Sequence, residues 1–142
     1  MSTRNEQSFN VWIVVRPAAD VPGQWVAHCL DLDVVTYGNS LRHALDMVHE
    51  AARNTILDDL NSNQDPMDRR APRECWDEMF KKLMPRAKRV EARDLVERNE
   101  RYAFVIAQLT LSFVRKSAGE SPKASKCETP VAFAESATPA CI

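Results

Sequence analysis

The 142-residue sequence predicts an α+β domain in which an antiparallel sheet of three or four strands packs one face against a long helix. Three observations lead to this prediction. Apolar residues recur with period two through much of the first 40 residues, and the period changes to that of a helix over residues 41–60. Hydrophobic residues make up 44% of the chain and charged residues 27%, a balance typical of a globular domain.

Three short strands are expected in the front part of the chain. Residues 9–16 (FNVWIVVR) are rich in β-branched and aromatic types, with apolar side chains on both faces. Pro22-Gly23 then fits the two central positions of a type II turn. A second strand over 24–30 and a third over 34–38 follow. Because the connections are short, the three strands should form an antiparallel meander.

The long helix is expected to begin at Leu41, where Asn39 or Ser40 can cap its first turn. Over about 20 residues its apolar side chains fall on one stripe. The members of this stripe are Leu41, Ala44, Leu45, Val48, Ala52, Ile56 and Leu60. This stripe matches the apolar face of the sheet, so the helix should pack against that face.

Residues 61–101 are expected to form a helical, charged insertion. Its first part, 61–71, is a polar break. An additional helix should begin at Pro72, a residue that suits the first helical position, and end at Pro85. The remainder, 86–101, fits either a marginal helix or a loop.

The last part of the chain divides into an uncharged segment and a tail. Residues 102–114 (YAFVIAQLTLSFV) alternate as a fourth strand would, although a buried helix accepts the same residues. Residues 115–142 repeat Ser, Ala, Pro, Lys and Glu, a composition that predicts a disordered tail. The single domain is therefore expected to span 1–114.

Charge is distributed unevenly although the formal net charge is only −1. The first 60 residues carry four basic and eight acidic side chains, a net of −4, whereas residues 61–101 carry eleven basic and nine acidic ones. Overall neutrality argues against general nucleic-acid binding. The basic residues of the middle could contact phosphates, but the interleaved acids favour a solvated, salt-bridged surface. These residues are Lys81, Lys82, Arg86, Lys88, Arg89 and Arg93.

No residue pattern predicts catalysis, a metal site or a cofactor. The four cysteines, Cys29, Cys75, Cys127 and Cys141, form no close pair of zinc ligands, so we expect reduced thiols, with Cys29 in the core. The three histidines, His28, His43 and His49, do not converge by spacing. The glycines, Gly23, Gly38 and Gly119, form no phosphate-binding loop. Because catalytic patterns are missing, we expect a protein that is not an enzyme. Because a membrane-length apolar run and an export signal are also missing, we expect it to be cytoplasmic.

Residues 25–56 resemble the core of the HicB-like antitoxin family. The resemblance is carried by an acid-leucine turn at Leu30-Asp31-Leu32, by a Gly-polar-Ser cap in Thr36–Ser40, and by a helix that starts with Leu41, Ala44 and Leu45. With the first strand it covers about 50 residues. The resemblance implies a partial ribonuclease H-like fold without catalytic acids. It also implies binding and neutralisation of a small basic ribonuclease toxin, together with self-association into a homo-oligomer.

The chain departs from the family pattern in two respects. The usual Pro-Asp-Leu-Pro-Gly turn is replaced by residues 28–33 (HCLDLD). No ribbon-helix-helix or helix-turn-helix pattern is present, which argues against DNA binding. Two hypotheses follow: an antitoxin-type protein-binding module, or a stand-alone oligomeric domain without a toxin. For the first, the expected contact residues near the sheet edge and turn are Trp25, Asp31, Asp33 and Tyr37.

Overall fold

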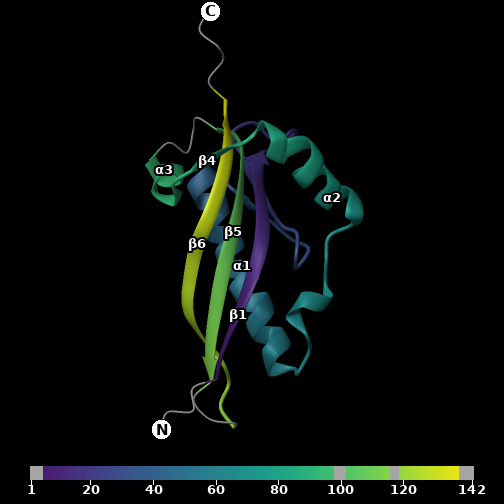
Figure 1. The fold of residues 1–142 in the computed structure, drawn as a ribbon, viewed down its shortest axis with the longest axis vertical. Coiled ribbons are helices and arrows are strands. Elements are labelled where there is room, and N and C mark those ends of the chain that lie inside the picture. The colour runs from purple at the N-terminus through teal and green to yellow at the C-terminus, as the bar shows by residue number, and fades with distance from the viewer. Residues whose placement is uncertain (1–4, 98–101, 116–118, 138–142) are drawn as a thin grey trace, which may run out of the picture.

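A computed structural model describes residues 5–97, 102–115 and 119–137 of the chain. Its α+β architecture contains a six-stranded antiparallel sheet of order β3-β2-β1-β5-β6-β4 (Figure 1). The strands are β1 (Asn5–Pro17), β2 (Trp25–Cys29), β3 (Val34–Gly38), β4 (Lys88–Val90), β5 (Tyr102–Arg115) and β6 (Lys123–Ser136). The α-helices are α1 (Leu41–Asn61), α2 (Arg73–Asp77) and α3 (Ala92–Glu97).

The front of the chain folds as its periodicity predicts. Strands β1, β2 and β3 form an antiparallel meander, and Gly23 has the positive φ of 81° that its turn requires. Ser40 is the N-cap of helix α1, and its Oγ accepts a hydrogen bond from the His43 amide at 3.0 Å. All seven residues of the predicted stripe are buried, and α1 packs on one face of the sheet.

A second helical segment covers part of the opposite face of the sheet. Here α2 continues into a π-helical stretch, η2 (Glu78–Leu83), followed by the short η3 (Met84–Arg86). Met79 and Leu83 of η2 pack against Val14 of β1 and Ile106 of β5. The sheet is therefore sandwiched at this end, with α1 behind it and α2 beside the opposite face (Figure 1).

The sheet has six strands, so the expectation of three or four was wrong. Residues 102–114 do form a strand, β5, which lies between β1 and β6 and is buried on both faces over much of its length. Two-sided burial explains its nearly continuous apolar sequence. In the segment 86–101, where a helix or a loop was open, the structure has β4 and α3, while 98–101 lie outside the described residues.

The predicted disordered tail is also corrected, because residues 123–136 form strand β6. This strand pairs along almost the whole of β5 and also holds β4. Its polar composition misled the prediction because residues 123–128 are exposed, while only Ala132 and Ala134 are fully buried. Backbone pairing to a buried neighbour stabilises a strand whose side chains contribute little apolar burial.

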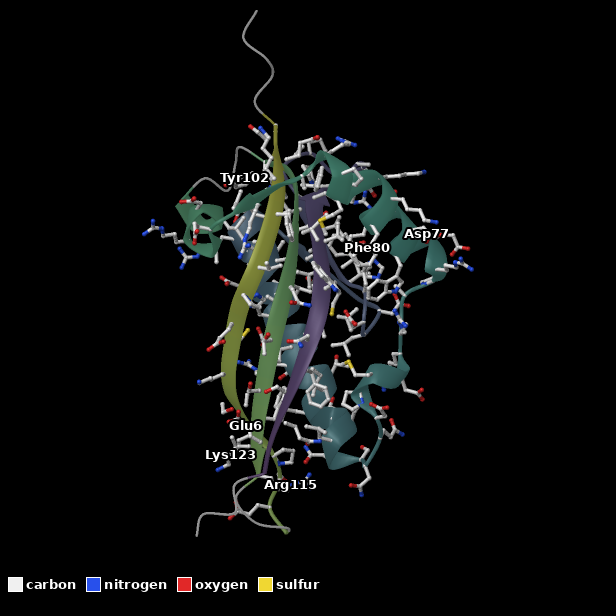
Figure 2. The ribbon with its side chains drawn as sticks, in the orientation of Figure 1. Glu6, Asp77, Phe80, Tyr102, Arg115 and Lys123 are labelled. Carbon is white, nitrogen blue, oxygen red and sulfur yellow. The ribbon has the colours of Figure 1, made fainter. Side chains whose placement is uncertain are left out.

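The three longest strands, β1, β5 and β6, extend beyond the part of the sheet that α2 and η2 cover (Figure 1). On this open face, polar side chains pair across β1 and β5: Ser8 with Ser112 at 2.9 Å, and Thr110 donating to Asn10 at 2.7 Å. Glu6, Arg115 and Lys123 lie together at the tip (Figure 2). None of the helices in the described ranges is long and apolar enough to cross a membrane.

Candidate functional site

Two of the four predicted contact residues lie on opposite faces of the sheet. Trp25 is buried with Ala27 and Cys29 on the face that packs against α1. Tyr37, on β3, is 53% exposed and pairs in register with Val26, on the other face. Trp25 is therefore a core residue, and the structure does not bring it together with Tyr37.

Asp31 closes the end of the β1–β2 ladder. Strand pairing ends at Ile13 and Cys29, and Asp31 Oδ1 then accepts a hydrogen bond from the Trp12 amide at 2.6 Å. The Trp12 carbonyl accepts from the Leu30 amide at 2.9 Å, so both backbone groups of Trp12 are satisfied. Burial raises the pKa of the Asp31 carboxyl above its usual value. This geometry gives Asp31 a structural part in the fold.

Asp33 lies in the turn between β2 and β3. Its backbone has a positive φ of 51°, a conformation that aspartate tolerates better than most residues. The side chain is exposed, and its Oδ1 lies 2.9 Å from His28 Nε2. Of the four predicted residues, Asp33 is the one that combines an exposed carboxylate with a location at the turn.

Asp33 and three further aspartates line two hollows near this turn. We call these four exposed residues, Asp33, Asp58, Asp65 and Asp68, the acidic corner. Asp33 and Asp58 line a shallow hollow of about 340 Å³ together with the end of α1. Asp65 and Asp68 line a neighbouring hollow of about 360 Å³. Arg69 lines both hollows and so connects them.

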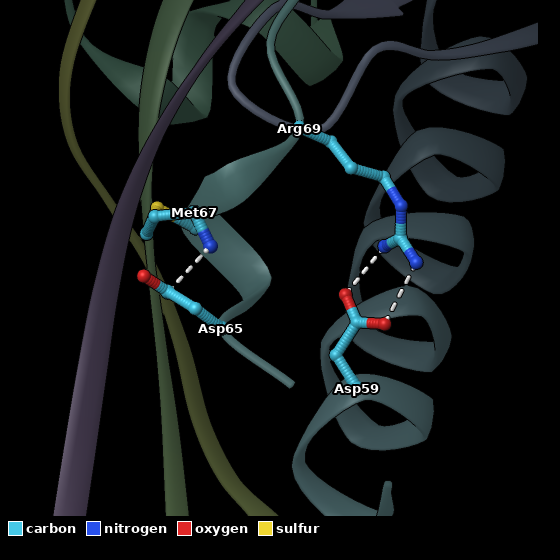
Figure 3. Close-up of polar contacts among 4 residues, drawn as sticks. All are labelled: Asp59, Asp65, Met67 and Arg69. Atoms are coloured by element: carbon cyan, nitrogen blue, oxygen red, sulfur yellow. Dashed lines mark hydrogen bonds and ion pairs between the residues drawn. The ribbon is translucent and has the colours of Figure 1, made fainter. Parts of the chain in front are cut away.

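Among the described residues, Arg69 supplies the one guanidinium that lines these hollows, and a fifth carboxylate already binds it. Arg69 donates two hydrogen bonds to the buried Asp59 of α1, one of them from Nη2 to Oδ1 at 2.8 Å (Figure 3). This bidentate contact raises the pKa of Arg69. Asp65 accepts from the Met67 amide at 2.9 Å, which fixes the loop beside them (Figure 3). The charge of Arg69 is therefore offset by Asp59, and the acidic corner keeps its negative charge.

The residues predicted from sequence include Asp33 but not the other three members of the acidic corner. They belong to the end of α1 and to the following loop, which reach the β2–β3 turn only after α1 has packed on the sheet. A signal was nevertheless present: residues 57–68 (LDDLNSNQDPMD) contain four aspartates and no lysine or arginine. This local density of one charge could have identified the acidic corner.

His49 and Cys127 form an unexpected side-chain pair between α1 and β6. Cys127 Sγ lies 3.8 Å from His49 Nδ1, and His49 Nε2 is buried with no hydrogen-bond partner among the residues that the structure describes. Burial lowers the pKa of His49 and raises that of the Cys127 thiol. Both shifts favour the neutral pair, which is the opposite of what an activated cysteine nucleophile requires.

Several basic side chains of the middle segment are paired with acids. Arg73 and Lys81 approach Asp77 at 3.8 and 3.6 Å, and Arg86 forms two hydrogen bonds with Glu135, the shorter of them 2.5 Å. This pairing is that of a salt-bridged surface rather than of a free phosphate-binding stripe. Within the described parts of the chain, no three His, Cys, Asp or Glu residues are arranged to hold a metal ion.

Comparison with known proteins returns no match for this chain among protein-family models, curated proteins or solved structures.

Proposed function

We propose that this chain is a non-catalytic, antitoxin-type protein-binding module that binds a small basic ribonuclease toxin through the acidic corner. The observation that supports this proposal is the concentration of four exposed aspartates around two adjoining hollows. The resemblance of residues 25–56 to HicB-like antitoxins suggests the class of partner. The charge of the acidic corner suggests where such a partner would dock.

The rigidity of the acidic corner favours specific recognition over loose attraction. Asp58 projects from the last turns of α1, and Asp33 is held by the turn between two paired strands. The Asp59–Arg69 contact ties the loop of Asp65 and Asp68 to the same helix. A rigid set of like charges accelerates association with a partner of opposite charge and rejects partners of the same charge.

The test is co-expression of the chain with the product of the adjacent reading frame, followed by purification of the complex. In the double variant Asp58→Lys/Asp68→Lys, we expect the association rate constant to fall by about tenfold or more at low salt, because steering by the acidic corner is reversed. Raising the ionic strength should lower the wild-type rate towards that of the variant.

The matched control is Glu50→Lys/Glu74→Lys, which changes the net charge equally at exposed positions outside the acidic corner. It should retain most of the wild-type association rate. If no basic partner binds, the proposal fails. If both double variants slow association equally, net charge rather than the acidic corner is responsible, and the proposed interface is wrong.

A further inference from the structure

Strand β3 is a sheet edge that carries neither a charged residue nor a proline. It pairs with β2 on one side, and no described strand pairs with its other side. At the opposite side of the sheet, β4 carries Lys88 and Arg89, and the part of β6 beyond β4 carries Lys126 and Pro130. Charged residues and proline are among the devices that prevent edge-to-edge pairing. The sequence of β3, VVTYG, contains neither.

Exposed apolar side chains gather along this edge. On β3, Val35 is 47% exposed and Tyr37 is 53% exposed, and both face the side of the sheet opposite α1. On α1, Met47 is 39% exposed. It lies eleven residues before Asp58, about 20° away around the helix, and Asp58 lines a hollow with Val34 of β3. Met47 is therefore on the flank of α1 that borders the β3 edge.

The residues of β3 and its ends are complementary to a second, antiparallel copy of themselves. A two-fold axis through Thr36 would place Val35 opposite Tyr37 in both halves of the pair, an aromatic–β-branched combination that stabilises sheets. The same register would place Asp33 opposite Asn39, so that the single charge of this segment would not meet its own copy. A closed, isologous contact of this kind generates a dimer and no larger polymer.

A hollow beside Val35 adds a place for the partner side chain. It has a volume of about 160 Å³ and is lined mainly by apolar residues of β1, β2 and η2, with Arg16 and Glu78 paired at 2.5 Å on its wall. Tyr37 of a second copy, set opposite Val35, would lie next to this hollow. The β3 edge therefore offers backbone groups for pairing, and the sheet face that carries Val35 and Tyr37 offers an apolar contact.

We propose that two copies of this chain associate through their β3 strands, in antiparallel register about Thr36, to form one continuous sheet. The occupant is a second copy because the register is self-complementary in both charge and apolar contacts. A basic partner is a poorer fit, since residues 34–38 carry no acid. The acidic corner stays outside the paired residues except for Asp33, so this proposal does not depend on the binding of a toxin.

The experiment is sedimentation analysis of the purified full chain over a wide concentration range. Wild type should form a dimer. In the double variant Val35→Lys/Tyr37→Lys, each lysine faces a lysine of the second copy, and dimerisation should weaken by about tenfold or more. The double variant Val35→Glu/Tyr37→Glu should be monomeric for the same reason. An equimolar mixture of the two variants should restore a dimer, because lysine then faces glutamate at each position.

The control is Ala124→Lys/Ser125→Lys, which places two lysines at exposed positions of β6, on the other side of the sheet from β3, and should leave the dimer intact. Circular dichroism of each variant verifies that it folds. A monomeric wild type overturns the proposal, as does a dimer that persists unchanged in both charged variants. Restoration in the mixture is the result that a merely misfolded variant would not give. Because no toxin is present, the outcome is independent of the proposed function.

Discussion

Asp31 shows how one residue can replace a missing strand partner. Where β2 leaves β1, its carboxylate accepts the Trp12 amide at 2.6 Å. Asp31→Ala would leave this amide without a partner, which should lower the free energy of unfolding by about 1–3 kcal/mol. Asp31→Asn keeps an acceptor oxygen and should stay within about 1 kcal/mol of wild type. Urea denaturation measures both; equal losses in the two variants would contradict the assigned hydrogen bond.

The same carboxyl should give a pH dependence of definite sign. Burial raises the pKa of Asp31 in the folded protein above the ordinary value of 3.8, so over the interval between the two values the folded state binds more protons. Stability therefore falls as pH rises through that interval and is constant above it. The difference in unfolding free energy between wild type and Asp31→Asn isolates this contribution. A difference that increases with pH over this interval would show that the pKa is lowered instead.

Gly38 is required by close packing at the junction of β3 and α1. A Cβ atom at this position would lie 2.7 Å from the Ala44 Cα and still closer to the Ala44 nitrogen, both backbone atoms that cannot rotate away. Gly38→Ala should therefore destabilise the protein by about 1–3 kcal/mol. Gly119→Ala is the matched control, since no atom lies within 4 Å of its added Cβ. Thermal unfolding of the two variants compares them directly, and similar midpoints would refute the proposed clash.

At the scale of elements, α1 and β6 represent opposite degrees of predictability. Helix α1 combines a serine cap with an uninterrupted apolar stripe, so its local sequence and its tertiary environment agree. Strand β6 is mostly polar and contains Pro130, and its order comes from pairing with β5. Local composition describes what a segment can bury by itself, and it omits the hydrogen bonds that a buried neighbour supplies.

The order of β6 can be tested with two substitutions on one face of the strand. Ala132 is 2% exposed and pairs with Ala107, whereas Ala124 is exposed and pairs with Phe113. Ala132→Asp would bury an unpaired carboxylate and should cost roughly 3 kcal/mol or more. Ala124→Asp should change stability by less than about 0.5 kcal/mol. Chemical denaturation decides between them: near-zero effects for both would mean that β6 is not part of the folded sheet.

At the scale of the whole molecule, surface charge differs from the charge of sequence segments. The first 60 residues have a net charge of −4. The acidic corner nevertheless takes Asp65 and Asp68 from the following segment, in which basic residues outnumber acidic ones. Two of those basic side chains are paired with other carboxylates, Arg86 with Glu135 and Arg69 with Asp59. The summed charge of a sequence segment therefore gives the sign of that segment but not the place on the folded surface where charge accumulates.

The sequence alone determined the β1–β3 meander, the cap and apolar stripe of α1, and the burial of Cys29. For residues 102–114 it favoured a strand and left a buried helix as the alternative. These features depend on neighbours within a few residues, where periodicity and capping act. Tertiary structure decided the remainder: the burial of Trp25, the structural part of Asp31, the strand β6 and the assembly of the acidic corner. Each depends on contacts between residues that are distant in sequence. The local pattern of residues along the chain does not specify such contacts.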